Sequence, residues 1–242
     1  MRIAIYSDVH GNLEALEAVL KDIKREEVDK RFFLGDVVGY GPNPNECIEL
    51  VKKNADVILA GNHDWAAVGL TDSAYFNPYA KESLFWTMEN ITDANKEYLR
   101  TLKPASTVDN IQLCHSTPVE PQEWRYILTM QDAMDNYDGL EKPVCFIGHS
   151  HQPVIIEFAD GSNIVPIRDI YKTLEPNRKY IVNVGSVGQS RDSNPESCYV
   201  VYDTKTNNIE YRRVEYDVAK VQKKMEKHKL PHYLIERLGV GR

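Results

Sequence analysis

The 242-residue sequence is poor in cysteine and contains no Cys-x-x-Cys pair. Because thiol-based zinc ribbons and dithiol redox sites need closely spaced cysteines, both classes are disfavoured. We expect the four isolated thiols to be small buried apolar side chains in a reducing compartment; they are Cys47, Cys114, Cys145 and Cys198.

Long apolar runs and an excess of positive charge are also missing. No stretch is long enough to span a bilayer, and the apolar segment before Asp8 is too short for a secretory signal, so we expect a cytoplasmic location. The formal net charge of -7 disfavours a general nucleic-acid or anionic-membrane binder. A small phosphorylated substrate remains compatible, because a bound cation can reverse the local sign. The oligomeric state is left open.

The length favours one domain over residues 1–242. In the first quarter, apolar runs at 1–6, 31–34 and 57–60 predict buried strands, and apolar residues at helical spacing over 13–23 predict a helix. A second helix is expected from Asn45, after a loop rich in glycine and proline. Alternating strands and helices at this spacing imply a largely parallel sheet.

The segment from about 65 to 110 is expected to be helical and is rich in aromatic residues. Asn77 followed by Pro78 predicts a helix start, with the helix running to about Met88, and Thr92 predicts a second start with an end near Leu102. Packing against the body is the favoured interpretation of the aromatics, and a cap over the site is the alternative; they are Tyr75, Phe76, Tyr79, Phe85 and Trp86.

The second half is expected to be mostly strands. The predicted strands cover 110–114, 143–147, 154–158, 180–184, 199–202 and 209–214. Hairpin turns are expected around Asp160-Gly161 and at residues 206–208. A last amphipathic helix over about 218–228 precedes a polar tail.

Polar side chains follow five of the predicted strands. They are Asp8 with His10, then Asp36, Asn62, His115, and finally His149 with His151. Carboxylate, imidazole and amide ligands without a thiolate suit Mn, Fe, Zn, Mg or Ni, with Mn or Fe favoured. Seven ligands are too many for one tetrahedral ion, whereas two divalent ions that share a carboxylate fit the count.

At these residues the chain resembles the calcineurin-like metallophosphoesterase superfamily. The five blocks occur in the family's order; they are Asp8-Val9-His10, Gly35-Asp36-Val37-Val38, Gly61-Asn62-His63-Asp64, His115 and Gly148-His149-Ser150-His151. The resemblance extends over essentially the whole chain and is strongest to the small bacterial and archaeal phosphodiesterase-like and diadenosine-polyphosphatase-like members. It departs from the pattern at Ser116, where the family usually has glycine. The resemblance implies a layered αββα sandwich, in which helices flank two packed mixed sheets and the metal site lies at the strand C-termini.

The resemblance also implies roles for individual residues. Asp8, His10 and His151 would hold one metal ion. Asn62, His115 and His149 would hold the other, and Asp36 would bridge the two. His63 would face the substrate, where it protonates the leaving oxygen or stabilises phosphoryl charge, and Asp64 would orient its ring. Spacing gives partial support, since residues two apart in an extended segment, such as His149 and His151, point the same way.

Other candidates for substrate contact are Asn12, Tyr40 and Arg191. Arg191 can clamp a phosphate or be a solvated surface arginine. Asn12 can bind substrate or cap a helix, with the cap favoured. Tyr40 can line the pocket or pack beneath its loop. Trp124 and Arg125 can touch a nucleobase or anchor a loop, and the loop is favoured.

The implied reaction is hydrolysis of a phosphomonoester, phosphodiester or phosphoanhydride by a metal-bridging hydroxide that attacks phosphorus directly. The substrate would be a nucleotide, a dinucleoside polyphosphate or another small phosphorylated compound. One alternative is a non-catalytic scaffold that binds protein partners, as in the retromer-associated relative, which lacks the equivalent of His63. Another alternative is a nuclease, which the acidic charge disfavours.

Overall fold

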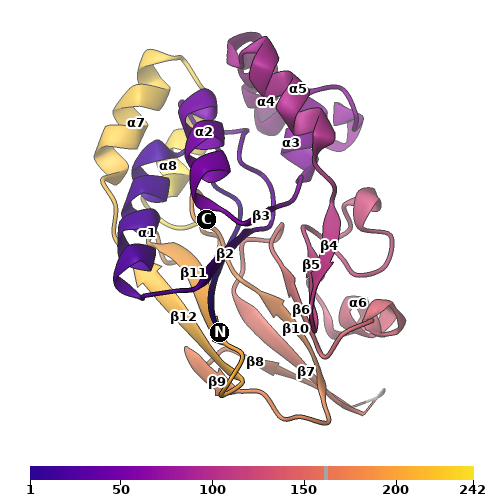
Figure 1. Ribbon diagram of the computed structural model, residues 1–242. Helices are drawn as coiled ribbons and strands as arrows, with labels where there is room; N and C mark the ends of the chain where they lie inside the picture. Colours follow the sequence, from indigo (N-terminus) through magenta and orange to yellow (C-terminus); the bar gives the residue numbers. More distant parts are fainter. Residues whose placement is uncertain (161–162) are drawn as a thin grey trace.

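In the computed structural model of the protein, which describes residues 1–160 and 163–242, the strands form two mixed six-stranded sheets (Figure 1). The first sheet runs in the order β3 (Val57–Ile58), β2 (Lys30–Phe33), β1 (Arg2–Tyr6), β11 (Ser197–Asp203), β12 (Asn208–Val214) and β9 (Tyr171–Thr173). The second runs in the order β4 (Ala105–Val108), β5 (Ile111–Cys114), β6 (Val144–Ile147), β10 (Lys179–Asn183), β7 (Val154–Asp160) and β8 (Asn163–Ile167). The expected sandwich of two mixed sheets is confirmed.

The core between the sheets follows from side-chain alternation along the strands. Ile3 and Ile5 of β1 share one buried cluster with Phe146 of β6, which joins the facing surfaces of the two sheets. The intervening residues Ala4 and Tyr6 belong to a different cluster on the outer face of the first sheet. Because β1 is buried on both faces after Arg2, its residues from Ile3 to Tyr6 form an apolar run that does not alternate with polar residues.

Helices cover the outer faces of both sheets (Figure 1). The helices are α1 (Leu13–Arg25), α2 (Pro44–Asn54), α3 (Asn62–Ala67), α4 (Pro78–Asn90), α5 (Asp93–Thr101), α6 (Met130–Asp135), α7 (Val218–Lys227) and α8 (His232–Leu238). Buried residues of α1 and α2 pack against the outer face of the first sheet, and α6 packs against that of the second. No helix in the described residues is long and apolar enough to span a membrane.

Three predicted helix starts are confirmed by their caps. The side chains of the capping residues accept backbone hydrogen bonds: Asn12 from Ala15, Asn77 from Ala80 and Thr92 from Asn95. The predicted start at Asn45 is wrong by one residue, since α2 begins at Pro44 with Asn43 as its cap. Proline fits this first position because its missing N–H needs no partner there.

Three predicted segments differ more. The end of the segment expected to be helical over about 65–110 is strand β4, Ala105–Val108. The strand expected over 57–60 ends at Ile58, and the polar stretch after it enters helix α3 at Asn62. The C-terminal tail is not simply polar, because α8 buries Leu234, Ile235 and Leu238 against α7 and the loop of Tyr40. Strands β7 and β8 pair antiparallel as expected, although Gly161 of the predicted turn lies outside the described residues. All four cysteines are buried free thiols.

A buried carboxylate joins α1 to α7. Glu14 is 7% exposed, and its Oε1 lies 2.7 Å from Lys224 Nζ and 3.2 Å from Lys220 Nζ. Burial alone would raise the pKa of Glu14, but the two ammonium groups outweigh burial and lower that pKa below its ordinary value of 4.5.

We therefore expect Glu14→Gln to lower the free energy of unfolding at pH 7 by about 1–3 kcal/mol. A depressed carboxyl pKa stabilises the fold above the unfolded pKa, and that contribution is lost as the pH falls through the folded pKa. The difference between wild type and variant should thus shrink below pH 4.5. Urea unfolding at pH 7 and at a pH below 4.5 measures this difference in unfolding free energy. The exposed Glu17→Gln on the same helix is the control. An equal loss at all pH values would contradict the ion-pair account.

Candidate metal centre

The loops at the C-terminal ends of parallel strands meet at one edge of the sandwich. β1 runs parallel to β2, and β6 runs parallel to both β5 and β10, so their following loops emerge on the same side within each sheet. The backbone N–H of His149 donates to Asp8 Oδ2 at 3.1 Å, which links a loop of the second sheet to a loop of the first. All seven predicted metal ligands lie here, and none is more than 7% exposed.

The backbone of this centre turns sharply at the ligands. Asp8, His10, Asp36, His149 and His151 all have positive φ, between 51° and 65°. Non-glycine residues adopt this left-handed conformation rarely and at an energetic cost, and such residues concentrate at functional sites. The expectation that His149 and His151 lie in an extended segment is therefore wrong, although both side chains reach the centre.

Each of four histidine rings is fixed by a backbone carbonyl. The bonds are His10 Nδ1 to Val38 O (3.0 Å), His115 Nδ1 to Leu34 O (3.0 Å), His151 Nδ1 to Gln189 O, and His149 Nε2 to Trp124 O (2.9 Å). Because a carbonyl only accepts, the bonded nitrogen carries a hydrogen and the other ring nitrogen is turned toward the centre, where His10 Nε2 and His151 Nε2 lie 3.1 Å apart. This pattern presents four imidazoles as ligands.

The two aspartates each have one oxygen held by backbone and one directed at the histidines. Asp36 Oδ1 accepts from the His63 N–H at 2.8 Å, while Oδ2 lies 3.3 Å from His115 Nε2 and 3.7 Å from His10 Nε2. Asp8 Oδ1 lies 3.2 Å from His151 Nε2. Asp36 is therefore the carboxylate placed between the two groups of histidines.

Three ligand atoms are buried without a hydrogen bond, namely Asp8 Oδ1, Asn62 Oδ1 and His115 Nε2. The first and third have only ion-pair neighbours, the nearest at 3.2 and 3.3 Å, and Asn62 Oδ1 has none among the described residues. Leaving such atoms unpaired is costly in a folded protein unless something else binds them. Possible ligand atoms of Asp8, His10 and His151 lie within 4.8 Å of one another, as do those of Asp36, His115 and His149. The donor set and its unpaired atoms fit hard or borderline divalent ions.

Charges in the centre are strongly coupled. Burial would lower the pKa of His115, but the nearby Asp36 carboxylate outweighs it and raises that pKa to about 9. Burial lowers the pKa of His149 to about 3, which leaves this ring neutral. A bound cation would take the place of the proton on His115, since metal ligands must be deprotonated.

His63 lies in the first turn of α3 rather than on a strand. Its ring packs against Tyr40, Phe76 and His10, with centroid distances of 4.5, 4.7 and 4.9 Å. Burial lowers its pKa to about 4, and its Nδ1 has no hydrogen-bond partner. A ring nitrogen of His63 also lies within 4.8 Å of ligand atoms of His10 and Asp36.

The expected role of Asp64 in orienting the His63 ring is not what the structure shows. The two carboxylate oxygens of Asp64 accept four backbone N–H groups at 2.8–3.1 Å, from Gly61, Asp36, Val37 and Val38. Asp64 therefore shapes the loop that carries Asp36. Sequence spacing did not reveal this role, because the donors are backbone groups 26 to 28 residues away along with one nearby glycine.

The close fit of this loop leaves no room for a side chain at Gly61. Its φ of -104° suits any residue, but an added Cβ would overlap Asp36 Oδ1. We expect Gly61→Ala to displace Asp36 and to lower kcat/KM at least about 100-fold, as misplacement by about 1 Å does elsewhere. Assay of the purified variant measures this. Gly239→Ala is the control, because the nearest atoms there are 3.7 Å away. Equal activity of both variants would contradict the proposed position of Asp36.

The three predicted substrate contacts separate into two groups. The Asn12 amide is used within the fold, since its Oδ1 accepts from Ala15 N–H at 3.1 Å and its Nδ2 donates to Gly188 O at 2.9 Å. The capping interpretation of Asn12 is thus the one that the structure shows. Tyr40 and Arg191 both reach the centre, where Arg191 Nη2 lies 3.4 Å from the Tyr40 hydroxyl.

An aromatic cavity of about 150 Å³ adjoins the centre. It is lined by Asn62, Thr71, Asp72, Phe76, Glu123, Trp124, Tyr126 and His149. Tyr126 stacks on His149 with ring centroids 4.0 Å apart, and Trp124 anchors its loop by donating from Nε1 to Thr71 Oγ1 at 3.0 Å. Trp124 thus anchors its loop and at the same time lines this cavity. The sequence does not indicate a role for Tyr126, because a single aromatic residue in a loop has no distinguishing pattern.

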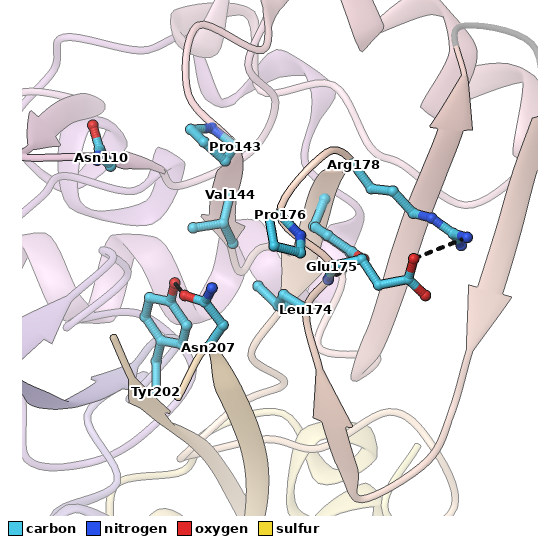
Figure 2. A pocket seen from close by; sticks show the side chains of 10 residues that line it. Asn110, Pro143, Val144, Leu174, Glu175, Pro176, Arg178, Tyr202 and Asn207 are labelled. Carbon is cyan, nitrogen blue, oxygen red and sulfur yellow. Dashed lines mark hydrogen bonds and ion pairs between the residues drawn. The ribbon is translucent and has the colours of Figure 1, made fainter. Parts of the chain in front are cut away.

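A separate cavity of about 210 Å³ lies away from these ligands, at the start of β6, and Figure 2 shows its lining. Val144, the first residue of β6, borders it, whereas the ligands His149 and His151 follow the end of that strand. Its arginine, Arg178, is paired with Glu175 at 3.0 Å. This cavity shares no residue with the metal centre.

The chain is similar to known proteins over its whole length. A family model described as the calcineurin-like phosphoesterase superfamily domain matches residues 1–207. An uncharacterized protein of Methanocaldococcus jannaschii is 41% identical over 246 residues, covering 99% of this chain and 98% of the relative. The crystal structure of a metallophosphoesterase from Sphaerobacter thermophilus has a TM-score of 0.90 at 38% identity and covers 100% of this chain and 99% of that chain. A hypothetical protein from Pyrococcus horikoshii OT3 shares the fold, with a TM-score of 0.82, 21% identity, and coverage of 100% and 98%.

Proposed function

We propose that this chain, which belongs to the calcineurin-like phosphoesterase superfamily, is an enzyme that hydrolyses phosphoesters or phosphoanhydrides of small substrates with two divalent metal ions. One observation carries the proposal. Buried ligand atoms of Asp8, Asn62 and His115, none of which makes a hydrogen bond, converge where four imidazoles each turn a ring nitrogen toward the centre. Such an arrangement is costly for a scaffold and useful for a metal-dependent hydrolase.

The proposed ligand assignment follows the two ligand groups. Asp8, His10 and His151 would hold one ion. Asn62, His115 and His149 would hold the other, and Asp36 would bridge them. When bound, the two ions supply a hydroxide nucleophile near neutral pH and neutralise phosphate charge. We favour manganese or iron, since these ligands accept several metals and availability often decides.

The chain's own residues complete the proposed mechanism. As the bond between phosphorus and the leaving oxygen breaks, His63 would give a proton to that oxygen or stabilise the phosphoryl charge. An approaching phosphate anion favours the protonated imidazole, which offsets the depressed pKa that burial gives His63. Asp64 would hold the backbone of the Asp36 loop in place, and Phe76 and Tyr40 would exclude water around His63.

The test is an assay of chelator-treated protein against p-nitrophenyl phosphate, bis-p-nitrophenyl phosphate and diadenosine tetraphosphate. We expect hydrolysis to be absent without metal and to return with Mn²⁺ or Fe²⁺. The proposal would be overturned if the protein hydrolysed none of the three substrates with any of the metals Mn, Fe, Zn, Mg or Ni. We further propose that the protein is cytoplasmic, in keeping with its four free buried thiols.

A further inference from the structure

Arg191 is a cation without an anionic partner beside the metal centre. In the described part of the chain, no carboxylate lies within ion-pair distance of its guanidinium, and its Nε is buried without a hydrogen-bond partner. Its Nη2 contacts only neutral groups, the Tyr40 hydroxyl at 3.4 Å and Gln189 Oε1 at 3.0 Å. Arg191 is only partly exposed, and a positive charge with a desolvated Nε and neutral neighbours is costly, so the arrangement favours binding of an anion.

Two other arginines around the centre are paired with carboxylates, whereas Arg237 of α8 donates to the backbone carbonyl of Arg242. Arg213 forms an ion pair with Asp192, next to Arg191 in sequence, and Arg125 on the Trp124 loop pairs with Glu120 at 2.9 Å. These arginines have a structural partner that explains their position. Arg191 has none, which separates it from an ordinary surface arginine.

Contacts hold Arg191 on the side of the centre where His151 and His63 lie. Its backbone N–H donates to the carbonyl of His151 at 3.3 Å. The Tyr40 ring, whose hydroxyl meets the guanidinium, lies 4.5 Å from the ring centroids of both His63 and His10. The positive charge of Arg191 also depresses the pKa of His63, after the larger effect of burial. The guanidinium therefore lies on the same side of the centre as His63.

Tyr126 links Arg191 to His149, a ligand of the second metal group. Burial raises the pKa of the Tyr126 phenol, although the positive charge of Arg191 acts to lower it, and the Tyr126 ring stacks on His149 at 4.0 Å. Arg191 thus lies between two phenols, one packed on ligands of each metal group. From that position the guanidinium faces whatever the centre binds.

We propose that Arg191 makes the centre selective for phosphomonoesters over phosphodiesters. A monoester has one more ionised oxygen than a diester, because the diester uses that oxygen for its second ester bond. A fixed guanidinium pairs with this additional oxygen through charge-assisted hydrogen bonds. A diester leaves the same guanidinium without an anionic partner. The inference rests on the proposed phosphoesterase function and specifies its substrate class.

The test compares kcat/KM for p-nitrophenyl phosphate and bis-p-nitrophenyl phosphate in the manganese-loaded protein. We expect Arg191→Gln to lower the monoester value about 10- to 100-fold and to leave the diester value nearly unchanged. Arg191→Lys should restore part of the monoester activity, because lysine keeps the charge but not the planar fork. Arg125→Gln is the matched control and should leave both values unchanged. Equal losses on both esters, or no loss, would overturn the proposal.

A binding measurement separates this inference from catalysis. Calorimetric titration of the manganese-loaded protein with inorganic phosphate should give an affinity about 10-fold weaker in Arg191→Gln, with dimethyl phosphate bound equally by both proteins. Equal phosphate affinity in both proteins would overturn the role of Arg191. If wild type binds phosphate through Arg191 but hydrolyses neither ester, the proposed function fails while the anion contact stands. If Arg191→Gln does not fold, the same comparisons are decided with Arg191→Lys.

Discussion

Replacing His63 with alanine is expected to lower kcat by about 10²- to 10⁴-fold, the usual contribution of a general acid, while the bound metal content stays at the wild-type level. The reason lies in its surroundings. His63 packs among Tyr40, Phe76 and His10, and its Nδ1 is bound by no protein group. Elemental analysis of the variant, combined with single-substrate kinetics, measures both quantities.

The control for this prediction is His232→Ala, because His232 is exposed at the start of α8 and distant in sequence from every ligand. It should change neither metal content nor kcat. Loss of metal from His63→Ala would show instead that His63 is a ligand, an assignment that its proximity to His10 and Asp36 would allow. In that case the proposed proton transfer would need another donor.

Replacing Asp36 with asparagine is expected to have the second large effect, a loss of at least about 10³-fold in kcat/KM together with weakened metal binding. Asp36 Oδ2 is the oxygen placed between His115 and His10. Asparagine keeps the shape but removes the charge that two cations would share. Activity as a function of manganese concentration, and the metal content at each concentration, test the prediction.

Asp56→Asn is the matched control for Asp36→Asn. Asp56 also accepts a backbone hydrogen bond near the first sheet, from Arg31 N–H at 2.9 Å, but it is paired with Lys30 far from the ligand set. Its substitution should alter stability only slightly, as is usual for exposed ion pairs. Full activity of Asp36→Asn at the wild-type manganese requirement would remove Asp36 from the mechanism.

The ligand types could be predicted from the sequence because each ends or follows an apolar run, as Asp36 and His115 do. Their backbone conformation could not. The left-handed φ of Asp8 and Asp36 is imposed by contacts between loops, such as the bond from Asp8 N–H to Gly35 O at 3.0 Å. Local propensity gives no sign of such long-range contacts.

Two kinds of error have the same physical origin. The family resemblance predicts that Asp64 orients the neighbouring histidine, whereas its oxygens accept from backbone groups of a loop about 27 residues earlier in the chain, such as Val37. The sequence predicts a polar C-terminal tail, because the seven residues of α8 make too few turns for a clear helical period. In both cases the decisive partners are brought close only by tertiary packing.

The sandwich itself was more predictable than the site's surroundings. Strands such as β1 and β10 are strongly apolar, and helix starts at Asn77 and Thr92 have local capping signals. By contrast, the unpaired charge of Arg191 and the stacking of Tyr126 on His149 depend on single residues without a motif. Only the folded arrangement distinguishes these from surface residues.

The central claim is that this edge of the sandwich holds two metal ions joined by Asp36. The most direct measurement is an anomalous difference map from crystals of the protein grown with Mn²⁺. We expect two peaks about 3.5–4 Å apart, one beside Asp8 and His151 and the other beside Asn62 and His115, with the Asp36 carboxylate between them. A map with no peak at these residues, or with a single peak that Asp36 does not contact, would contradict the account.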